Sequence, residues 1–193
     1  MTRQNRLGNL FVVSGPSGVG KGTVIGRILL SVPDIEKSIS VTTRKPRASE
    51  ENGQDYFFVS KEEFDRMVDE NLFMEWAEFT GNFYGTPIQG VKDKLKQGKD
   101  VILEIEIQGA KQIHSRYPHA CLIFLSPPSI SVLEERLKGR NTESPEKLAL
   151  RLSKAGEEMA ERHIFQYEVI NDNLDNAVKT LEDIVYARRV NDN

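Results

Sequence analysis

Four short apolar runs set the pattern of the chain, at residues 10–14, 101–107, 120–126 and 167–171. Each run has the length of a β-strand and is rich in β-branched residues. Apolar side chains at helical spacing follow several of the runs, at Val24 and Ile28, at Leu133 and Leu137, and from Leu174 to Val185. Strands that alternate with helices predict an α/β fold, a three-layer core in which helices cover both faces of a parallel sheet.

Two segments interrupt this alternation. Residues about 36–99 hold a polar, basic and aromatic stretch and then a short helix, for which Ser60 and Glu63 have the spacing of a capping box. Residues about 127–160 are rich in charge, and Ser144 followed by Pro145 predicts the start of a helix there. We interpret both segments as insertions between core strands, a substrate-binding insertion and a lid.

A single domain is therefore predicted over residues 1–193. Its core comprises residues about 1–35, 100–126 and 161–193. With 38% hydrophobic and 28% charged residues, the chain is typical of a globular protein with a packed core.

Charge and apolar content argue against several classes of partner. The net charge of −3 gives no general attraction to nucleic acid or to an anionic membrane, so we expect neither. No apolar run approaches the roughly 20 residues that span a bilayer, and the N-terminus lacks the pattern of a signal peptide. Cys121 is the only cysteine, which favours a reducing, cytoplasmic location. The oligomeric state, a homo-oligomer included, stays open.

A glycine-rich run directly follows the first apolar run and opens a helix, the context of a Walker A phosphate loop. Its residues are Gly15, Pro16, Ser17, Gly18, Val19, Gly20, Lys21, Gly22 and Thr23. The glycines permit backbone conformations in which successive N–H groups point at phosphate oxygens, at the positive end of a helix. Lys21 adds a positive charge for the outer phosphates of a nucleoside triphosphate. This context argues against a glycine-rich turn of purely structural use.

The loop departs from the general pattern at one position. Gly22 stands where Ser or Thr normally follows the lysine, and Thr23 comes next. The expected cofactor of such a loop is Mg²⁺ bound with ATP. The hydroxyl nearest to the metal is therefore that of Thr23 or none, and a direct contact and a contact through water both stay open.

A second cluster lies in residues 40–58. Arg44, Arg47 and Tyr56 are close in sequence, and two guanidinium groups with a phenol suit a phosphate monoester. A solvated basic loop is the alternative. Further along, Glu75 lies among aromatic residues in FMEWAEF, which is typical of a purine pocket, although surface charge at a helix end would explain it too.

The motifs GPSGVGKGT, SVTTRKPR, NGQDYFFVS, MEWAEF, GNFYGTP, LEIEIQG and INDNLD together resemble the guanylate kinase family, in the family's order, over residues about 10–175. The resemblance implies a P-loop kinase that transfers a phosphoryl group from ATP to GMP. It implies that guanine is read by Ser40, Glu75 and Thr86. It also implies that the GMP phosphate is held by Arg44, Arg47, Tyr56 and Tyr84, and that Asn171 lies near the adenine of ATP.

The chemistry of guanine agrees with this resemblance. Guanine presents two adjacent donors, N1–H and the amino group, which the Glu75 carboxylate can accept, and an O6 acceptor to which the Ser40 hydroxyl can donate. Adenine has a lone pair at N1, which would face the carboxylate unfavourably. A site left with unpaired polar groups rejects the wrong substrate strongly.

Two carboxylates alternate with apolar residues in VILEIEIQG. We predict that Glu104 and Glu106 lie on the same side of one strand, near the end at which ligands bind in such sheets. By resemblance, Glu106 occupies a position that contacts GMP or the metal shell, whereas an amphipathic edge strand is the alternative.

Arginines recur in the predicted lid. Cationic groups stabilise the charge that spreads over a transferring phosphoryl group. By resemblance, the lid supplies Arg136, Arg140 and Arg151, and these residues with Lys21 and Arg44 are the expected catalytic residues. For Asn171, capping of the following helix is an alternative or additional role.

Two other functions fit parts of the pattern. A kinase for another nucleotide, such as AMP, fits the GKGT form but not Glu75 or the SVTTRKPR run. A non-catalytic guanylate-kinase-like scaffold module fits the fold, but such modules lack an intact phosphate loop. The sequence therefore favours an ATP:GMP phosphotransferase.

Overall fold

The computed structural model describes residues 6–138 and 145–191. The predicted helix start at Ser144 and the lid residue Arg140 lie outside these described residues. The chain divides into two compact units, each built from two stretches of sequence. Unit 1 comprises Met1–Leu10 and Asp34–Ala120, and unit 2 comprises Phe11–Pro33 and Cys121–Asn193.

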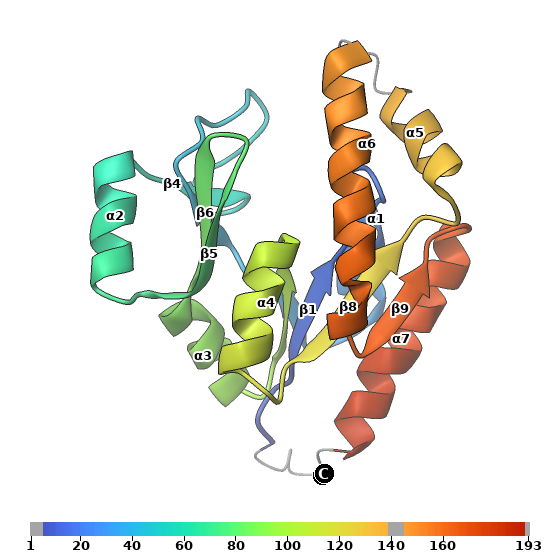
Figure 1. The fold of residues 1–193 in the computed structure, drawn as a ribbon. Helices are drawn as coiled ribbons and strands as arrows, with labels where there is room; N and C mark the ends of the chain where they lie inside the picture. The colour runs from blue at the N-terminus through green and yellow to red at the C-terminus, as the bar shows by residue number, and fades with distance from the viewer. Residues whose placement is uncertain (1–5, 139–144, 192–193) are drawn as a thin grey trace. The chain divides into compact units, whose positions relative to one another are not determined.

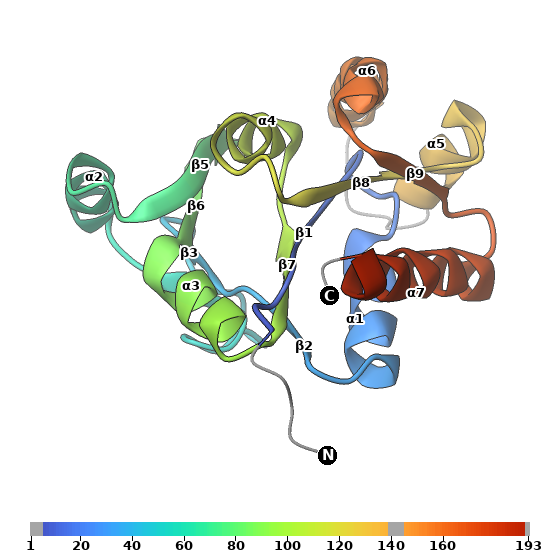
Figure 2. The same ribbon diagram turned by 90° about the horizontal axis from the view of Figure 1, so that it is seen from below.

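Three parallel strands form the centre of unit 2. Strand β1 (Leu10–Ser14) pairs with β8 (Cys121–Ser126), which pairs with β9 (Tyr167–Ile170). The helices are α1 (Lys21–Ser31), α5 (Ile130–Lys138), α6 (Pro145–Ala160) and α7 (Leu174–Asn191), and a 3₁₀ turn (Glu161–Ile164) precedes β9. Every residue of β1 and β8 is buried, as expected of parallel strands covered on both faces. Figure 2 shows α1 and α7 on one face of β8 and β9, and α6 on the other.

Unit 1 contains a parallel strand pair and a separate four-stranded sheet. Strands β2 (Ile35–Lys37) and β7 (Asp100–Glu104) form the pair. The sheet has the order β4-β3-β6-β5, with β3 (Ser40–Thr42), β4 (Tyr56–Phe58), β5 (Phe73–Phe79) and β6 (Asn82–Pro87). Its helices, labelled in Figure 1, are α2 (Lys61–Asp69), α3 (Ile88–Lys96) and α4 (Ile107–Arg116).

The predicted α/β fold with a mostly parallel sheet is confirmed, and so are the four apolar runs as strands over most of their lengths. The short helix after Ser60 is confirmed too. Its Ser60 hydroxyl accepts from the Glu63 N–H at 3.2 Å, and Phe64 packs in a core cluster with Val41 and Phe73. The Glu63 carboxylate binds Arg66.

Two expectations of local structure were incomplete or wrong. The sequence did not predict the four-stranded sheet, because β3 and β4 have only three residues each and show no period-two alternation. The strand predicted over residues 101–107 ends at Glu104, and α4 begins at Ile107. Buried Ile107, Ala110 and Ile113 have helical spacing, which the alternation of Glu104 and Glu106 with isoleucine concealed.

Among the described residues, we find no helix whose length and apolar character would let it cross a bilayer.

Candidate active site

The phosphate loop lies in unit 2, between β1 and α1. Gly15, Gly18 and Gly20 have φ angles of 147°, 89° and 100°, in the region that side chains disfavour. At Gly15 the approach of the backbone adds a second constraint, because a Cβ there would lie 2.2 Å from the carbonyl oxygen of Leu125 in β8. The loop conformation therefore depends on glycine, as the Walker A pattern predicts.

The end of the loop forms the N-terminus of α1. Gly20 occupies the N-cap position with a left-handed backbone, and Lys21 begins the helix. The Lys21 ammonium donates to the carbonyl of Gly15, so its charge lies against the loop. Gly22 and Thr23 are exposed in the first turn. Free N–H groups and a positive helix end at this position suit an anion.

Three predicted residues from later in the chain contact the loop within unit 2. The buried Asn171 side chain donates from Nδ2 to the Val19 carbonyl at 2.8 Å. The Arg136 guanidinium donates to the Asn171 carbonyl at 2.8 Å and to the Val19 carbonyl at 3.4 Å. From α6, Arg151 donates to the Ser17 hydroxyl at 2.7 Å. Two of the predicted lid arginines therefore lie at the phosphate loop.

The alternative role of Asn171 as a helix cap is wrong. Helix α7 begins at Leu174, and the Asn173 carboxamide oxygen accepts from the Asn176 N–H at 3.1 Å. Asn173 therefore caps the helix, and Asn171 is free for its contact with the phosphate loop.

Unit 1 contains a pocket that gathers most of the residues predicted for the acceptor nucleotide. It is lined by Ser40, Tyr56, Glu75, Ala77, Phe79, Tyr84, Glu104, Ile105 and Glu106. These side chains come from β3, β4, β5, β6, the end of β7 and the turn between β7 and α4. A set of aromatic walls with several carboxylates suits a planar base that carries hydrogen-bond donors.

Glu75 is the buried carboxylate of this pocket, with 4% of its surface exposed. It pairs across the strands with Thr86, whose hydroxyl donates to Glu75 Oε1 at 2.5 Å. Burial raises the pKa of Glu75 to about 7, and the hydrogen bonds from the hydroxyl and backbone N–H of Thr86 oppose that rise only in part. A buried carboxyl with a perturbed pKa in a pocket is typical of a functional site.

Glu104, the last residue of β7, and Glu106, in the turn after it, differ in environment. The Glu104 carboxylate forms an ion pair with the Lys37 ammonium. Glu106 lies at the N-cap position of α4, outside the strand, and its Oε2 is buried with no hydrogen-bond partner among the described residues. The prediction that both share one side of a strand is wrong, although both line the pocket. A buried acceptor without a partner calls for a donor from a ligand or water.

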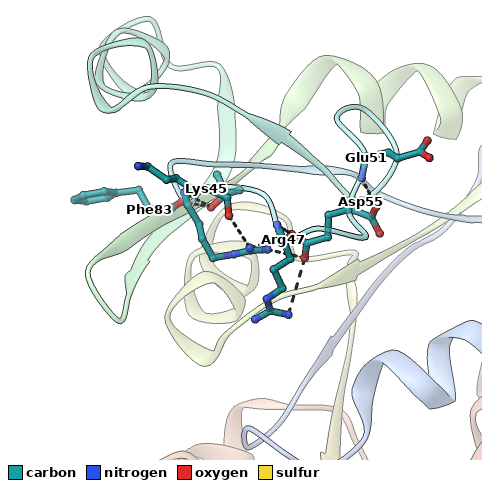
Figure 3. Close-up of polar contacts among 8 residues, drawn as sticks. Lys45, Arg47, Glu51, Asp55 and Phe83 are labelled. Atoms are coloured by element: carbon teal, nitrogen blue, oxygen red, sulfur yellow. Dashed lines mark hydrogen bonds and ion pairs between the residues drawn. The ribbon is translucent and has the colours of Figure 1, made fainter. Parts of the chain in front are cut away.

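Residues 40–58, called the phosphate arm below, contain Arg44 and Arg47, which both bond to a residue that the sequence did not single out. Glu50 accepts two hydrogen bonds from the Arg44 guanidinium, at 2.8 and 3.0 Å, and a third from the Arg47 backbone N–H at 2.8 Å. These bonds lower the pKa of Glu50 to about 2, and the bonds from the Arg44 side chain have the largest effect. Figure 3 shows this arm, in which Arg44 also donates to the Lys45 carbonyl at 2.9 Å.

The tyrosines connect the arm to the pocket. The Arg44 guanidinium lies 5.4 Å from the centre of the Tyr56 ring, and the rings of Tyr56 and Tyr84 meet edge to face at 6.1 Å. Burial raises the pKa of Tyr56, so its hydroxyl stays protonated near neutral pH. The Arg47 side chain is 75% exposed and reaches toward Glu50 from solvent. The arm thus offers two guanidinium groups and two phenols near one another.

All the predicted acceptor residues lie in unit 1, and the described donor residues lie in unit 2. Sequence reasoning missed Glu50 and named Glu104 without a role. The spacing of Glu50 three residues after Arg47 was the available signal for a charge partner, but it does not distinguish a buried pair from a solvated one.

A glycine-dependent phosphate loop between a parallel strand and a helix defines a P-loop nucleotide-binding protein. This chain also has, in unit 1, a pocket with aromatic side chains and a buried carboxylate. The family model for guanylate kinase matches residues 7–188, and the chain belongs to this family.

Individual relatives agree with the family match. The chain is 49% identical over 178 residues to a guanylate kinase of Synechocystis sp., covering 92% of this chain and 93% of the relative. It is 48% identical over 176 residues to a guanylate kinase of Prochlorococcus marinus, covering 91% and 95%. The solved structure of guanylate kinase from Anaplasma phagocytophilum superposes with a TM-score of 0.78 at 33% identity, covering 95% of this chain and 87% of that chain.

Proposed function

We propose that this protein catalyses the reversible transfer of a phosphoryl group from ATP to GMP, giving ADP and GDP, in purine nucleotide metabolism. The observation that carries the proposal is the buried Glu75 carboxylate, held by Thr86 in an aromatic pocket, in a chain that also has a complete phosphate loop. A member of the guanylate kinase family with both features has what each substrate requires.

Unit 2 binds ATP. The backbone N–H groups of the loop and the N-terminus of α1 bind the phosphates, and Lys21 moves from the Gly15 carbonyl onto the outer phosphates. Asn171 supports the loop at Val19 and lies near the base. Arg136 and Arg151, together with Arg140, stabilise charge on the transferring group.

Unit 1 binds GMP. Glu75 accepts hydrogen bonds from N1–H and the amino group of guanine, Thr86 orients the carboxylate, and Ser40 donates to O6. Glu106 accepts a further hydrogen bond from GMP with its unpaired Oε2. The phosphate is held by Arg44, Arg47, Tyr56 and Tyr84.

Mg²⁺ bound with ATP would supply positive charge that offsets the negative charge of the phosphates. The Thr23 hydroxyl, exposed in the first turn of α1, is an oxygen ligand of the kind that Mg²⁺ prefers, directly or through water. No covalent intermediate is required, because positioning and charge neutralisation supply most of the catalysis.

The division of the chain into core, insertion and lid is the one inferred from the sequence. Residues about 36–99 form the GMP-binding insertion and residues about 127–160 form a lid, in one guanylate-kinase-like domain. The protein works in the cytoplasm, which fits its one cysteine, Cys121, which is buried in β8 and forms no disulfide.

A coupled assay of ADP release with GMP, dGMP, AMP, UMP and CMP tests the proposal. We expect rapid turnover with GMP and far slower turnover with AMP, and loss of turnover in Lys21→Ala but not in the exposed control Lys92→Ala. Equal turnover with AMP would identify a different nucleotide kinase. Binding of GMP without any turnover would identify a non-catalytic module.

A further inference from the structure

Helix α4 covers the free edge of β5. Strand β5 lies at the end of the sheet order β4-β3-β6-β5, so one side of its backbone has no strand partner in that sheet. The Gln112 carboxamide occupies it, donating to the Trp76 carbonyl at 2.7 Å and accepting from the Trp76 N–H at 3.3 Å. Arg116 adds a bond to the Met74 carbonyl at 3.3 Å. Figure 1 and Figure 2 both show α4 beside β5.

Gly109 lies on the same face of α4, three residues before Gln112 and seven before Arg116. It is buried, and a Cβ at this position would lie 2.1 Å from Oε2 and 2.9 Å from Cδ of Glu75. Glycine inside a helix is disfavoured relative to alanine, so a buried one calls for a packing reason. The Glu75 carboxylate fills the space that a side chain of residue 109 would occupy.

We propose that Gly109 is a positioning residue that determines specificity, because its missing side chain creates the space in which Glu75 reads guanine. The inference rests on the proposed function of Glu75. Gly109 touches no substrate in this scheme and acts through the carboxylate alone.

Both α4 and the Glu75 carboxylate are held in place by hydrogen bonds. Two hydrogen bonds between Gln112 and the Trp76 backbone hold α4 against β5, so the helix cannot withdraw without uncovering the edge of this strand. The opposite oxygen of Glu75 is held by the Thr86 hydroxyl at 2.5 Å. A methyl group at residue 109 therefore displaces the carboxylate and breaks its bond to Thr86, since the side chain is the most mobile of these parts.

The test is the variant Gly109→Ala, studied by steady-state kinetics against both substrates. Displacement of a binding group by about 1 Å costs roughly 100-fold, so we expect kcat/KM for GMP to fall about 100-fold, mainly through KM. The KM for ATP stays unchanged. The matched control is Gly90→Ala in α3, where a Cβ meets nothing within 4 Å, and we expect it to behave as the unmodified protein.

A compensating change separates a steric mechanism from a general loss of structure. In Gly109→Ala/Glu75→Asp the carboxylate is shorter by one methylene and leaves room for the new methyl group. We expect the double variant to match Glu75→Asp alone and to bind GMP better than Gly109→Ala does. Independent, multiplying losses in the double variant, or an unchanged KM for GMP in Gly109→Ala, would overturn the inference.

The same series distinguishes this inference from the proposed function. If Glu75→Gln leaves the preference for GMP over AMP unchanged, the role of Glu75 itself fails. If Glu75→Gln removes the preference while Gly109→Ala leaves it intact, only the role of Gly109 fails.

Discussion

The buried Glu75 carboxyl makes stability depend on pH in a way that one substitution should remove. Its pKa is raised by burial to about 7, above the ordinary value of 4.5. A proton is thus held more tightly in the folded protein than in the unfolded chain. The contribution of Glu75 to stability is therefore fully present below pH 4.5 and is lost as the pH rises through 7.

The size of the effect follows from the same two values. Each tenfold change in proton affinity corresponds to about 1.4 kcal/mol, so the interval between 4.5 and about 7 amounts to about 3 kcal/mol. Glu75→Gln keeps the shape and the hydrogen-bonding capacity of the protonated acid and carries no charge at any pH. We expect the variant to unfold with a free energy up to about 3 kcal/mol higher than the parent above pH 7, and with little difference below pH 4.5.

Urea unfolding at a series of pH values from below 4.5 to above 7 measures this difference. The control is Glu78→Gln on the same strand, where the carboxylate is exposed and the slope against pH should match that of the parent. Glu75→Gln should also lose the preference for GMP over AMP. In this variant the free energy of unfolding above pH 7 therefore rises while the selectivity for GMP falls. A constant difference in the free energy of unfolding between the parent and Glu75→Gln across this pH range would refute a pKa of Glu75 raised by burial.

Two further predictions concern the phosphate-binding groups. Glu50→Gln should raise the KM for GMP about tenfold with little change in the KM for ATP, because Arg44 loses its charged partner. Unchanged kinetics would show that Glu50 does not position Arg44 for GMP. Gly15→Ala should lower the free energy of unfolding by about 3 kcal/mol in urea titrations, since its φ of 147° and the Leu125 carbonyl at 2.2 Å exclude a Cβ. A loss below about 0.5 kcal/mol would contradict that geometry.

The ionisation of Glu50 also sharpens the pH experiment. Its pKa is lowered to about 2, by the hydrogen bonds of Arg44 and then of the Arg47 backbone, so this carboxylate stays charged wherever Glu75 titrates. Glu75 must lose its proton to accept both donors of guanine, so we expect the KM for GMP to rise as the pH falls below 7. The phosphate of GMP also gains a proton at about pH 6, and only the part of the rise that is absent from Glu75→Gln reports on Glu75.

Much of unit 2 was predictable because its signals are local. The apolar run before Gly15, the glycine spacing and the helix after it are all written in consecutive residues. The contact of Asn171 with Val19 joins positions 152 residues apart and was not predicted; the resemblance to the family indicated only that Asn171 lies near the adenine of ATP. Its competing role as a helix cap was wrong, because Asn173 two residues later has the same chemistry at the correct position.

Unit 1 was less accessible to the same reasoning. Three-residue strands such as β3 and β4 carry no measurable period, so their sheet was missed, although several of the predicted site residues lie on it. Glu106 alternates with Glu104 as strand residues do, yet the turn into α4 intervenes. The space beside Glu75 could not be predicted at all, because an absent Cβ becomes informative only when the opposing side chain is known.

The chain passes from one unit to the other three times, after Leu10, Pro33 and Ala120. Neither unit therefore exists as one continuous stretch, and no single cut releases either of them. During synthesis the phosphate loop emerges early, but β8, Arg136 and Asn171, which define its surroundings, follow only after the whole second stretch of unit 1. The phosphate loop is thus synthesised early, but the contacts that surround it form only late. A chain that stops before Cys121 would contain the phosphate-loop motif without the ATP site around it.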